Sequence, residues 1–403
     1  MVVTEEKILD ASARDRFSKW RSPGVTEGSL ANLIRGWYSQ RTSESPPATN
    51  HSKEAIRIAH LAQRREVLKR ALPFVNRYGR DLLGWFAGGS EVRPADIDPE
   101  IVSVQADSEH SRLFRLASLR WSVPVSQGYG RRRRFVIVDR SIEKLIGIFA
   151  LGDPVFNLSP RDSLVGWTAR DRELRLRYVI DAFVLGAMPP YSNLLCGKLV
   201  AALTTSRETE KAFCEAYRGR KTSIRKKREN AKLGLLTTSA VFGRSSVYDR
   251  LRVSEHLQFL FAGTTKGYGH FHVPSDTFEA MVRLLEIKGH AYAHGNRFGN
   301  GPNWKMRVIR VALDLLGLDP SSLNHGFPRG VYIAPLASNY KEFLRGEQAG
   351  LRKDTQSKAE TIAETIKDRW ILPRSRRNQE WREINGSEQI ASAINSVAGR
   401  KLL

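Results

Sequence analysis

Short apolar runs bounded by turn-forming residues constrain the fold of this chain more than any other feature. Such runs occupy residues 135–138, 145–151 and 178–185, and residues 232–241 form a fourth. Apolar runs of this kind are typical of buried strands. Residues 194–203, after the third run, carry apolar side chains at helical spacing. Strands that alternate with helices indicate an α/β (α+β) core built on a mixed sheet.

The segments that flank this core have other patterns. Residues 52–85 place apolar side chains at helical spacing, which predicts one or two helices interrupted at Pro73. Residues 39–50 are polar, as linkers are. A helix is predicted at residues 302–316. We therefore divide the chain into five parts. They are a variable N-terminal segment with a linker (residues 1–50), an N-terminal helical region (51–98), the α/β core (99–270), an extension (271–346) and a basic helical tail (347–403).

Cysteine use and hydropathy bear on the compartment. The 403 residues include only Cys196 and Cys214, too few for a disulfide framework, which favours a reducing compartment. The first residues do not look like a secretory signal, and no run approaches the roughly 18 apolar residues that cross a bilayer. We expect a soluble, cytoplasmic protein with no membrane partner.

Positive charge dominates the composition. Lys and Arg number 65 against 42 acids, a net charge of +23. A solvated surface would explain either basic cluster alone, but two clusters in so basic a chain favour a nucleic-acid partner, with DNA as the first choice. The predicted nucleic-acid contacts are Tyr129, Arg131, Arg132, Arg133, Arg134, Lys221, Arg225, Lys226, Lys227 and Arg228.

The third strand leads through a turn into a helix, over residues 184–203. A helix start exposes backbone N–H groups beside a partial positive charge and so receives phosphate; Lys198 would add a charge there. This layout resembles the acyl-CoA site of the Gcn5-related acetyltransferases, although Leu195 stands where that family places its first glycine. The resemblance implies an acetyltransferase-like core that uses acetyl-CoA or another acyl donor. Its predicted cofactor contacts are Leu185, Gly186, Tyr191, Asn193, Gly197 and Lys198. A strand–turn–helix that only packs is the alternative.

Tyr248 occupies the place where that family carries a tyrosine that protonates the leaving thiolate. It lies on a predicted short helix at residues 245–251, with Ser246 in the first turn as a further catalytic candidate. A phenol with a pKa near 10 is a sensible acid for a thiolate. A tyrosine that merely packs its ring explains the same position equally well.

Asp181 is the candidate general base. It lies in the middle of the third apolar run, where a buried acid is unfavourable unless it is paired or functional. An ion pair with Arg177 or another arginine is the competing explanation.

Histidines gather late in the chain. His270 and His272 form a His-x-His pair on a predicted strand, while His290 and His294 lie four residues apart. Either pair has a spacing that can hold a metal. A structural, hydrogen-bonded role is the simpler reading of His270 and His272, and we expect no metal site.

Several segments, in one consistent order, closely resemble the DruA family of the Druantia anti-phage defence system. They are residues 121–135, 151–154, 161–167, 185–191 and 336–340, and the likeness spans about residues 52–377. Residues 237–251 also resemble the Mom protein of phage, an acetyltransferase-fold enzyme that modifies adenine in DNA. The resemblance implies an antiviral role beside other subunits of a defence system, and a transfer to a nucleobase.

Two functions therefore remain open. The first is a transferase that acts on a nucleobase through Asp181 and Tyr248. The second is a non-catalytic nucleic-acid-binding subunit whose core has lost its cofactor, with Leu195 as the trace of that loss. A Mg²⁺-dependent nuclease needs clustered carboxylates, and the acids of this chain are scattered.

Overall fold

The computed structural model describes residues 25–43, 52–125, 130–220, 232–255, 257–295 and 302–403. The chain divides into two compact units. A helical unit takes its residues from Met1–Asn50 and Lys266–Phe327, and a sheet unit takes its residues from His51–Thr265 and Pro328–Leu403. In sequence, the second segment of the helical unit is inserted between the last two strands of the sheet.

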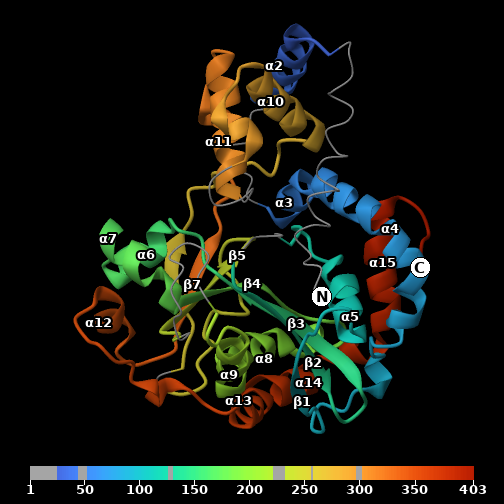
Figure 1. The fold of residues 1–403 in the computed structure, drawn as a ribbon. Helices are drawn as coiled ribbons and strands as arrows, with labels where there is room; N and C mark the ends of the chain where they lie inside the picture. Colours follow the sequence, from blue (N-terminus) through green and yellow to red (C-terminus); the bar gives the residue numbers. More distant parts are fainter. Residues whose placement is uncertain (1–24, 44–51, 126–129, 221–231, 256, 296–301) are drawn as a thin grey trace. The chain divides into compact units, whose positions relative to one another are not determined.

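The sheet unit contains a seven-stranded mixed sheet in the order β1-β2-β3-β4-β5-β7-β6 (Figure 1). Among these strands β4 and β5 are parallel and every other pair is antiparallel. The mixed α/β class is as predicted, although β7 joins the sheet from beyond residue 270. The strands are β1 (Pro99–Ser103), β2 (Arg132–Asp139), β3 (Lys144–Gly152), β4 (Val179–Ala187), β5 (Leu235–Ala240), β6 (Leu260–Thr264) and β7 (Gly330–Pro335).

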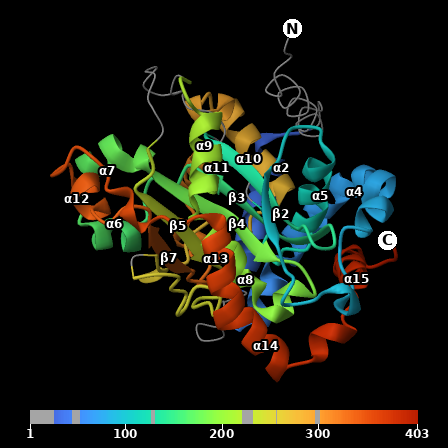
Figure 2. The ribbon, with the colours of Figure 1, turned by 90° about the horizontal axis from the view of Figure 1, so that it is seen from below.

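Helices cover both faces of this sheet (Figures 1 and 2). On one face, termed the α8 face, lie α8 (Cys196–Leu203), α9 (Arg207–Ala216) and α13 (Ala359–Ile366). On the opposite α4 face lie α4 (Leu61–Leu83), α5 (Glu109–Ser118) and α15 (Gly386–Ala398). The remaining helices of the unit are α3 (Lys53–Ala59), η2 (Gly89–Glu91), α6 (Ser159–Val165), α7 (Ala169–Arg175), η3 (Leu176–Tyr178), η4 (Tyr191–Leu194), α12 (Tyr340–Arg345), η7 (Lys353–Thr355), η8 (Lys367–Ile371), α14 (Leu372–Arg377) and η9 (Glu380–Glu383).

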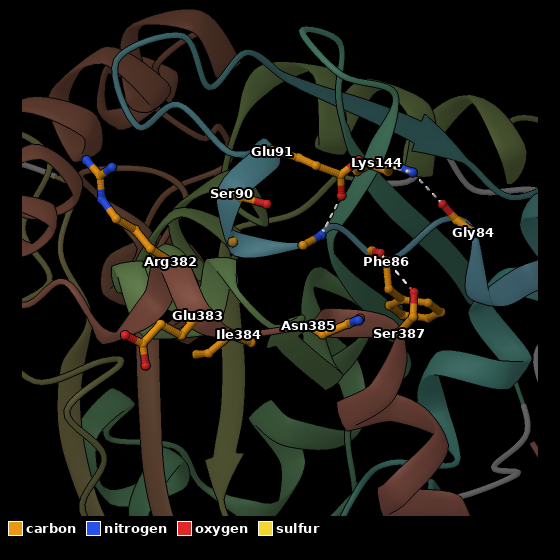
Figure 3. Close-up of a pocket in the computed structure, with 12 residues that line it drawn as sticks. Gly84, Phe86, Ser90, Glu91, Lys144, Arg382, Glu383, Ile384, Asn385 and Ser387 are labelled. Carbon is orange, nitrogen blue, oxygen red and sulfur yellow. Dashed lines mark hydrogen bonds and ion pairs between the residues drawn. The ribbon is translucent and has the colours of Figure 1, made fainter.

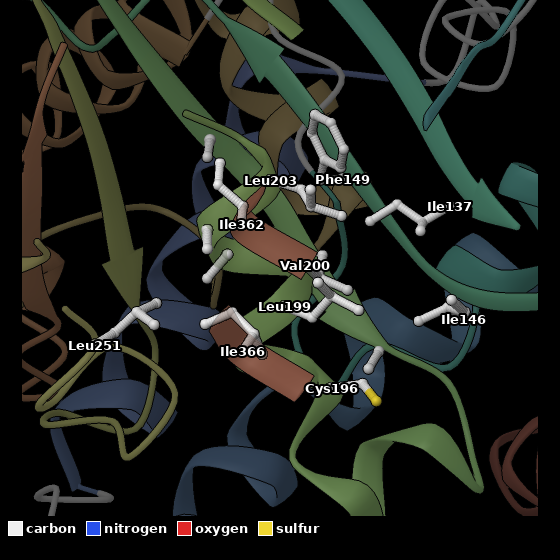
Figure 4. Close-up of a cluster of buried hydrophobic side chains, with 14 of the residues drawn as sticks. Ile137, Ile146, Phe149, Cys196, Leu199, Val200, Leu203, Leu251, Ile362 and Ile366 are labelled. Carbon is white, nitrogen blue, oxygen red and sulfur yellow. The ribbon is translucent and has the colours of Figure 1, made fainter. Parts of the chain in front are cut away.

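The central strands are apolar along their length because both of their sides are buried. Figure 4 shows the α8 face, where strand side chains meet those of α8 and α13. Its labelled members are Ile137, Ile146, Phe149, Cys196, Leu199, Val200, Leu203, Leu251, Ile362 and Ile366. The alternate strand residues, such as Val136 and Ile148, pack against α4, α5 and α15. Each fully buried Leu or Ile contributes about 1.5–3 kcal/mol, so the two cores hold the sheet in place.

The N-terminal helices break at His60 and not at Pro73, where the sequence predicted an interruption. Pro73 lies inside α4, which continues to Leu83. His60 lies between α3 and α4, with its Nδ1 3.2 Å from the carbonyl oxygen of Ile56. Its ring is buried, and burial lowers the pKa of His60 to about 4. The apolar stripe of α4 packs on the sheet, and this packing outweighs the local preference of proline.

The helical unit consists of α2 (Glu27–Ser43), α10 (Ser275–Ile287), η5 (Ala291–His294), α11 (Pro302–Leu315) and η6 (Pro320–Leu323). Its core joins Leu30 and Ile34 of α2 to Leu285 of α10 and Ile309 of α11. The helix predicted at residues 302–316 is therefore confirmed. Within the described part of the chain, no helix is long and apolar enough to cross a membrane.

Candidate functional site

The parallel strands β4 and β5 pair over four residues and then separate. Pairing runs from Val179 with Leu235 to Ala182 with Thr238. Beyond that point β4 continues along β3, while β5 continues along β7. The sheet therefore opens between the carboxyl halves of these two strands. Ligands of open α/β sheets bind outside the carboxyl ends of strands, where neighbouring strands part.

A β-bulge lies on β4 at the start of this opening. Ala150 of β3 pairs with Val184, whereas the next residue, Leu151, pairs with Ala182. Phe183 is consequently the extra residue of β4. Bulges bend a strand and re-aim its side chains, and they are frequent beside active sites.

Asp181 lies two residues before the bulge and is partly exposed. Its Oδ1 accepts a hydrogen bond of 2.7 Å from the hydroxyl of Thr237 on β5. Burial raises the pKa of Asp181 to about 6, against the opposing effects of this hydrogen bond and of the charges of Arg161 and Arg132. A carboxyl group with such a pKa can exchange a proton near neutral pH.

The two arginines that act on Asp181 are held by other groups. Arg161 is fully buried, and its Nε donates to Asp162 at 2.8 Å. The Arg132 guanidinium lies 3.9 Å from the centre of the Phe183 ring. Burial lowers the pKa of both guanidinium groups, so the region around Asp181 is poor in water and rich in positive charge.

Tyr248 lies buried beside the same opening. Its hydroxyl is 3.4 Å from Oγ1 of Thr238 on β5. Its ring centre lies 4.8 Å from that of Tyr332 and 5.5 Å from that of Phe259. Burial raises the pKa of Tyr248 to about 12, and the negative charge of Asp181 adds to the effect. The phenol therefore stays protonated and can serve only as a proton donor at neutral pH.

Two consecutive residues of β5 connect the candidate acid and base. Thr237 donates to Asp181, and Thr238 meets Tyr248. Because successive side chains of a strand point to opposite faces, Asp181 and Tyr248 reach β5 from opposite faces of the sheet. These two predicted residues therefore meet β5 at the last paired residues before β4 and β5 separate.

Residues 245–250 form a turn, and the helix predicted at residues 245–251 is wrong. The Nζ of Lys198 lies 2.6, 3.2 and 3.0 Å from the carbonyl oxygens of Ser246, Val247 and Asp249. In a helix those carbonyls would accept backbone N–H groups. The ammonium group of Lys198 takes them instead. The side chain of Ser246 is exposed, and the residue contacts Lys198 through its backbone carbonyl.

Tyr332 of β7 fixes the other side of this turn. Its hydroxyl accepts from the backbone N–H of Ser245 and donates to Oδ1 of Asp249, each at 2.9 Å. Arg244 lies 3.3 Å from the same carboxylate oxygen. The turn that carries Tyr248 is thus held from β7 and from α8.

The turn between β4 and α8 uses its polar groups inside the protein. The hydroxyl of Tyr191 donates to Oδ2 of Asp139 at 2.8 Å, and both residues are buried. The carbonyl of Asn193 accepts from Nε of Arg374 at 3.1 Å. Their assignment to a cofactor site stays a prediction.

The start of α8 is also covered. Leu195 has a φ of 63°, in the left-handed region. A Cβ added at Gly197 would lie 3.3 Å from Cγ2 of Val247, so the turn of Tyr248 packs against the first helical turn. Lys198 points into this contact, and burial lowers its pKa to about 8.

Leu185 and Gly186 lie on β4 beyond the bulge, and both are partly exposed. A Cβ added at Gly186 would lie 2.9 Å from the ring of Trp121, so glycine lets this indole approach the strand. Trp121 thereby links β4 to the segment that precedes β2.

The four consecutive arginines before and within β2 divide between the two faces of the sheet. Arg131 pairs with Asp153 at 2.7 Å and lies over Phe213 of α9. Arg133 donates to Ser103. Arg132 and Arg134 point to the α4 face, over Phe183 and Phe114. The remaining residues of the two predicted clusters, Tyr129, Lys221, Arg225, Lys226, Lys227 and Arg228, lie outside the described residues.

A depression of about 370 Å³ near the start of β3 offers less chemistry (Figure 3). Lys144 donates to the carbonyl of Gly84, and Glu91 accepts from the backbone N–H of Gly88. Ser387 of α15 donates to a nearby backbone carbonyl of Phe86. These groups hold neighbouring chain segments together, so the opening between β4 and β5 is the stronger candidate site.

His272 of the helical unit has structural partners. His270 and His272 lie in a turn, not on the predicted strand. The Nε2 of His272 is 3.0 Å from the carbonyl oxygen of Ser322, and its ring stacks on Trp37. In the portion of the chain that is described, no three His, Cys, Asp or Glu side chains gather as metal ligands do.

Sequence reasoning missed Thr237, Thr238, Tyr332 and Arg161. The two threonines lie inside an apolar run and resemble ordinary strand residues, because β-branched side chains favour strands. Arg161 looks like one more basic residue in a basic chain. Only the pairing of β4 with β5 reveals which hydroxyl groups meet Asp181 and Tyr248.

Comparison with known proteins gives one consistent result. A family model described as "Druantia protein DruA" matches residues 50–346. A protein of Escherichia coli (strain UMEA 4076-1) with the same description is 41% identical over 346 residues, which is 86% of this chain and 85% of that protein. No solved structure matches the chain.

Proposed function

The chain belongs to the DruA family of the Druantia anti-phage defence system, and from this premise we propose that it binds nucleic acid and transfers an acyl or related group to an amino group of a nucleobase. One observation carries the proposal. A carboxyl group with a raised pKa and a protonated phenol, Asp181 and Tyr248, contact the last two paired residues of β5 before β4 and β5 separate.

The sheet supports a core like that of the Gcn5-related acetyltransferases, which the sequence resembles in this region. Here β4 and β5 are parallel, separate after Ala182 and Thr238, and carry the bulge at Phe183 where they part. The same region therefore supplies both the resemblance and the geometry.

Acetyl-CoA or another thioester fits one end of this site better than the other. At the reacting end, Asp181 and Tyr248 suit a thioester, which would supply an activated acyl carbon. At the phosphate end, Val247 packs against Gly197 and Lys198 is bonded to three carbonyls. The residues at the start of α8 thus do not fit a pyrophosphate in the place where the family binds it.

The side chains of this chain suit the two proton transfers of such a reaction. Asp181 would accept a proton from the attacking amine, since a pKa of about 6 leaves it ionised at neutral pH. Tyr248, protonated at neutral pH, would supply a proton to a leaving group if a thioester were bound here. The hydroxyl groups of Thr237 and Thr238 hold the acid and the base in place.

The second function, a non-catalytic nucleic-acid-binding subunit, is favoured by the filled start of α8. If the core has lost its cofactor, Lys198 and Val247 now close the former phosphate site. The two functions make different predictions for Asp181 and Tyr248.

Nucleoside mass spectrometry on DNA and RNA from expressing cells, with and without phage, separates them. Wild type should yield a modified nucleoside, and Asp181→Asn and Tyr248→Phe should each abolish it or reduce it at least about 100-fold, as loss of a general acid or base does. Asp368→Asn, at an exposed carboxylate, and Tyr340→Phe, at a buried tyrosine, are the matched controls. Unmodified nucleosides together with full phage protection by both site variants would reject the transferase and leave the binding subunit.

A further inference from the structure

A groove of about 370 Å³ lies on the α4 face of the sheet unit, between α4, α5, α15 and the segment that follows α5. Its floor is apolar and includes Trp121. Four arginines line its edge, and no carboxylate is among its described lining residues. The floor residues are Val67, Leu68, Ala71, Leu119, Trp121, Pro124, Val125, Ile394 and Val397, and the arginines are Arg64, Arg70, Arg115 and Arg134.

Three of these four arginines have no carboxylate partner among the described residues. Arg70 pairs with Glu66 at 3.1 Å. Arg115 instead lies over Phe74, at 4.3 Å from the ring centre, and Arg134 lies over Phe114 at 5.7 Å. The Nε of Arg64 is buried without a hydrogen-bond partner in the described structure. Burial lowers the pKa of Arg64, which is partly exposed, while Arg115 and Arg134 are exposed, so an anion in the groove can reach these guanidinium groups.

We propose that this groove binds an unpaired segment of a nucleic-acid strand, with a base against the apolar floor and flanking phosphates on Arg64, Arg115 and Arg134. The proposal deepens the nucleic-acid half of the function proposed above and rests on it. Guanidinium groups match phosphate oxygens, while apolar and aromatic surface takes the face of an unstacked base.

The apolar floor selects a single strand over a duplex. In a duplex the bases are stacked and paired, and the backbone presents mainly phosphate, which would leave Trp121 and its apolar neighbours without a partner. Unpaired bases can turn out of the strand and lie on aromatic and apolar side chains. The groove therefore calls for an unpaired nucleotide.

Two lining residues of the groove connect it to the strands of the candidate site. Arg134 lines it, and Arg132 follows the same face of β2 to lie over Phe183, beside Asp181. Trp121 lines it as well and contacts Gly186 of β4. A strand held in the groove would thus carry a neighbouring nucleotide toward Asp181.

Salt dependence of binding tests the phosphate contacts. The affinity of a fluorescent single-stranded DNA is measured by anisotropy across a range of salt concentrations, with the full-length protein. Each lost phosphate contact on a single strand lowers the slope of log K against log[salt] by about 0.7, so Arg115→Ala with Arg134→Ala should lower it by about 1.4. The control, Arg93→Ala with Arg376→Ala, removes the same charge from exposed positions outside the groove and should keep the wild-type slope. A wild-type slope in the groove double variant would overturn the proposal.

A second variant tests the floor. Val67→Trp fills the groove from α4 and should weaken single-strand binding about tenfold while duplex binding changes little. Equal losses for single strand and duplex, in a variant that melts like wild type, would overturn the unpaired-strand assignment. A competition experiment gives a second way to overturn it. If CoA displaces the oligonucleotide from wild type but not from the Arg115→Ala, Arg134→Ala variant, the groove is a cofactor site. If the groove double variant lowers the salt slope as expected but wild type yields no modified nucleoside, the transferase is rejected and the groove remains a nucleic-acid site.

Discussion

The turn after β4 and the groove on the α4 face both gather positive charge, and they differ in how that charge is satisfied. Lys198 donates to three backbone carbonyls of one turn. Arg115 and Arg134 in the groove meet aromatic rings and no carboxylate among the described residues. A basic side chain that already has strong partners stabilises the fold, whereas one without them remains available for an anion.

The same contrast separates the Tyr191–Asp139 pair from Asp181. Tyr191 and Asp139 are hydrogen-bonded to each other in the interior. Asp181 has one hydroxyl donor among the described residues, Thr237, and a pKa raised to about 6 by burial. Replacing a residue that serves the fold should therefore lower the stability of the protein, whereas replacing a residue that serves a ligand should raise it.

Lys198→Met gives the largest expected effect. It removes the donor of three carbonyls in the turn of Tyr248, and each buried carbonyl left without a donor costs about 1–3 kcal/mol. We expect the free energy of unfolding to fall by about 3 kcal/mol or more in urea denaturation. Lys358→Met, at an exposed lysine, is the control and should change it little.

The comparison breaks if Lys198→Met leaves stability intact and instead weakens acyl-CoA binding in calorimetry. That pair of results would show that the ammonium group is free for phosphate, as the sequence resemblance implied. It would also return the start of α8 to the role of a cofactor site.

Asp181→Asn should stabilise the protein at neutral pH. Because the pKa rises from 3.8 to about 6 on folding, folding favours the protonated carboxyl. Its contribution to stability is greatest below pH 4 and is lost as the pH rises through about 6. An uncharged amide escapes that loss, so we expect a gain of up to about 3 kcal/mol at pH 7.

Urea denaturation of Asp181→Asn and wild type from pH 4 to pH 8 checks this sign. The gain should vanish near pH 4 and reach its full size above pH 7. A gain that is independent of pH would mean that the charge of Asp181 is not the cause.

Tyr191→Phe should lower stability by a smaller amount. It removes one hydrogen bond to a buried carboxylate, worth about 1.5 kcal/mol. The backbone N–H of Asp98 and the hydroxyl of Ser141 still donate to Asp139, which limits the loss. Tyr340→Phe is the control at a buried phenol of another cluster. A Tyr191→Phe protein of wild-type stability with lost cofactor binding would place Tyr191 at a ligand.

The sequence predicts the sheet more fully than the site, and particular residues show why. The apolar runs at residues 135–138 and 145–151 predict β2 and β3, because strand burial leaves a local pattern. The same reasoning fails at residues 245–251, where Lys198, far away in the sequence, replaces the hydrogen bonds of a helix. Asp181 and Tyr248 could be named from their positions, but Thr237 and Thr238 could not, since their role depends on strand pairing.

Ser246→Ala should have the smallest effect on stability and gives the sharpest separation of fold from chemistry at this turn. The side chain of Ser246 is exposed, and the group that Lys198 contacts is its carbonyl, which alanine retains. We expect the free energy of unfolding to stay within about 0.5 kcal/mol of wild type. Any loss of modified nucleoside in this variant would then report on the hydroxyl itself, whereas unchanged nucleosides would remove Ser246 from the catalytic group and leave the turn as the support of Tyr248.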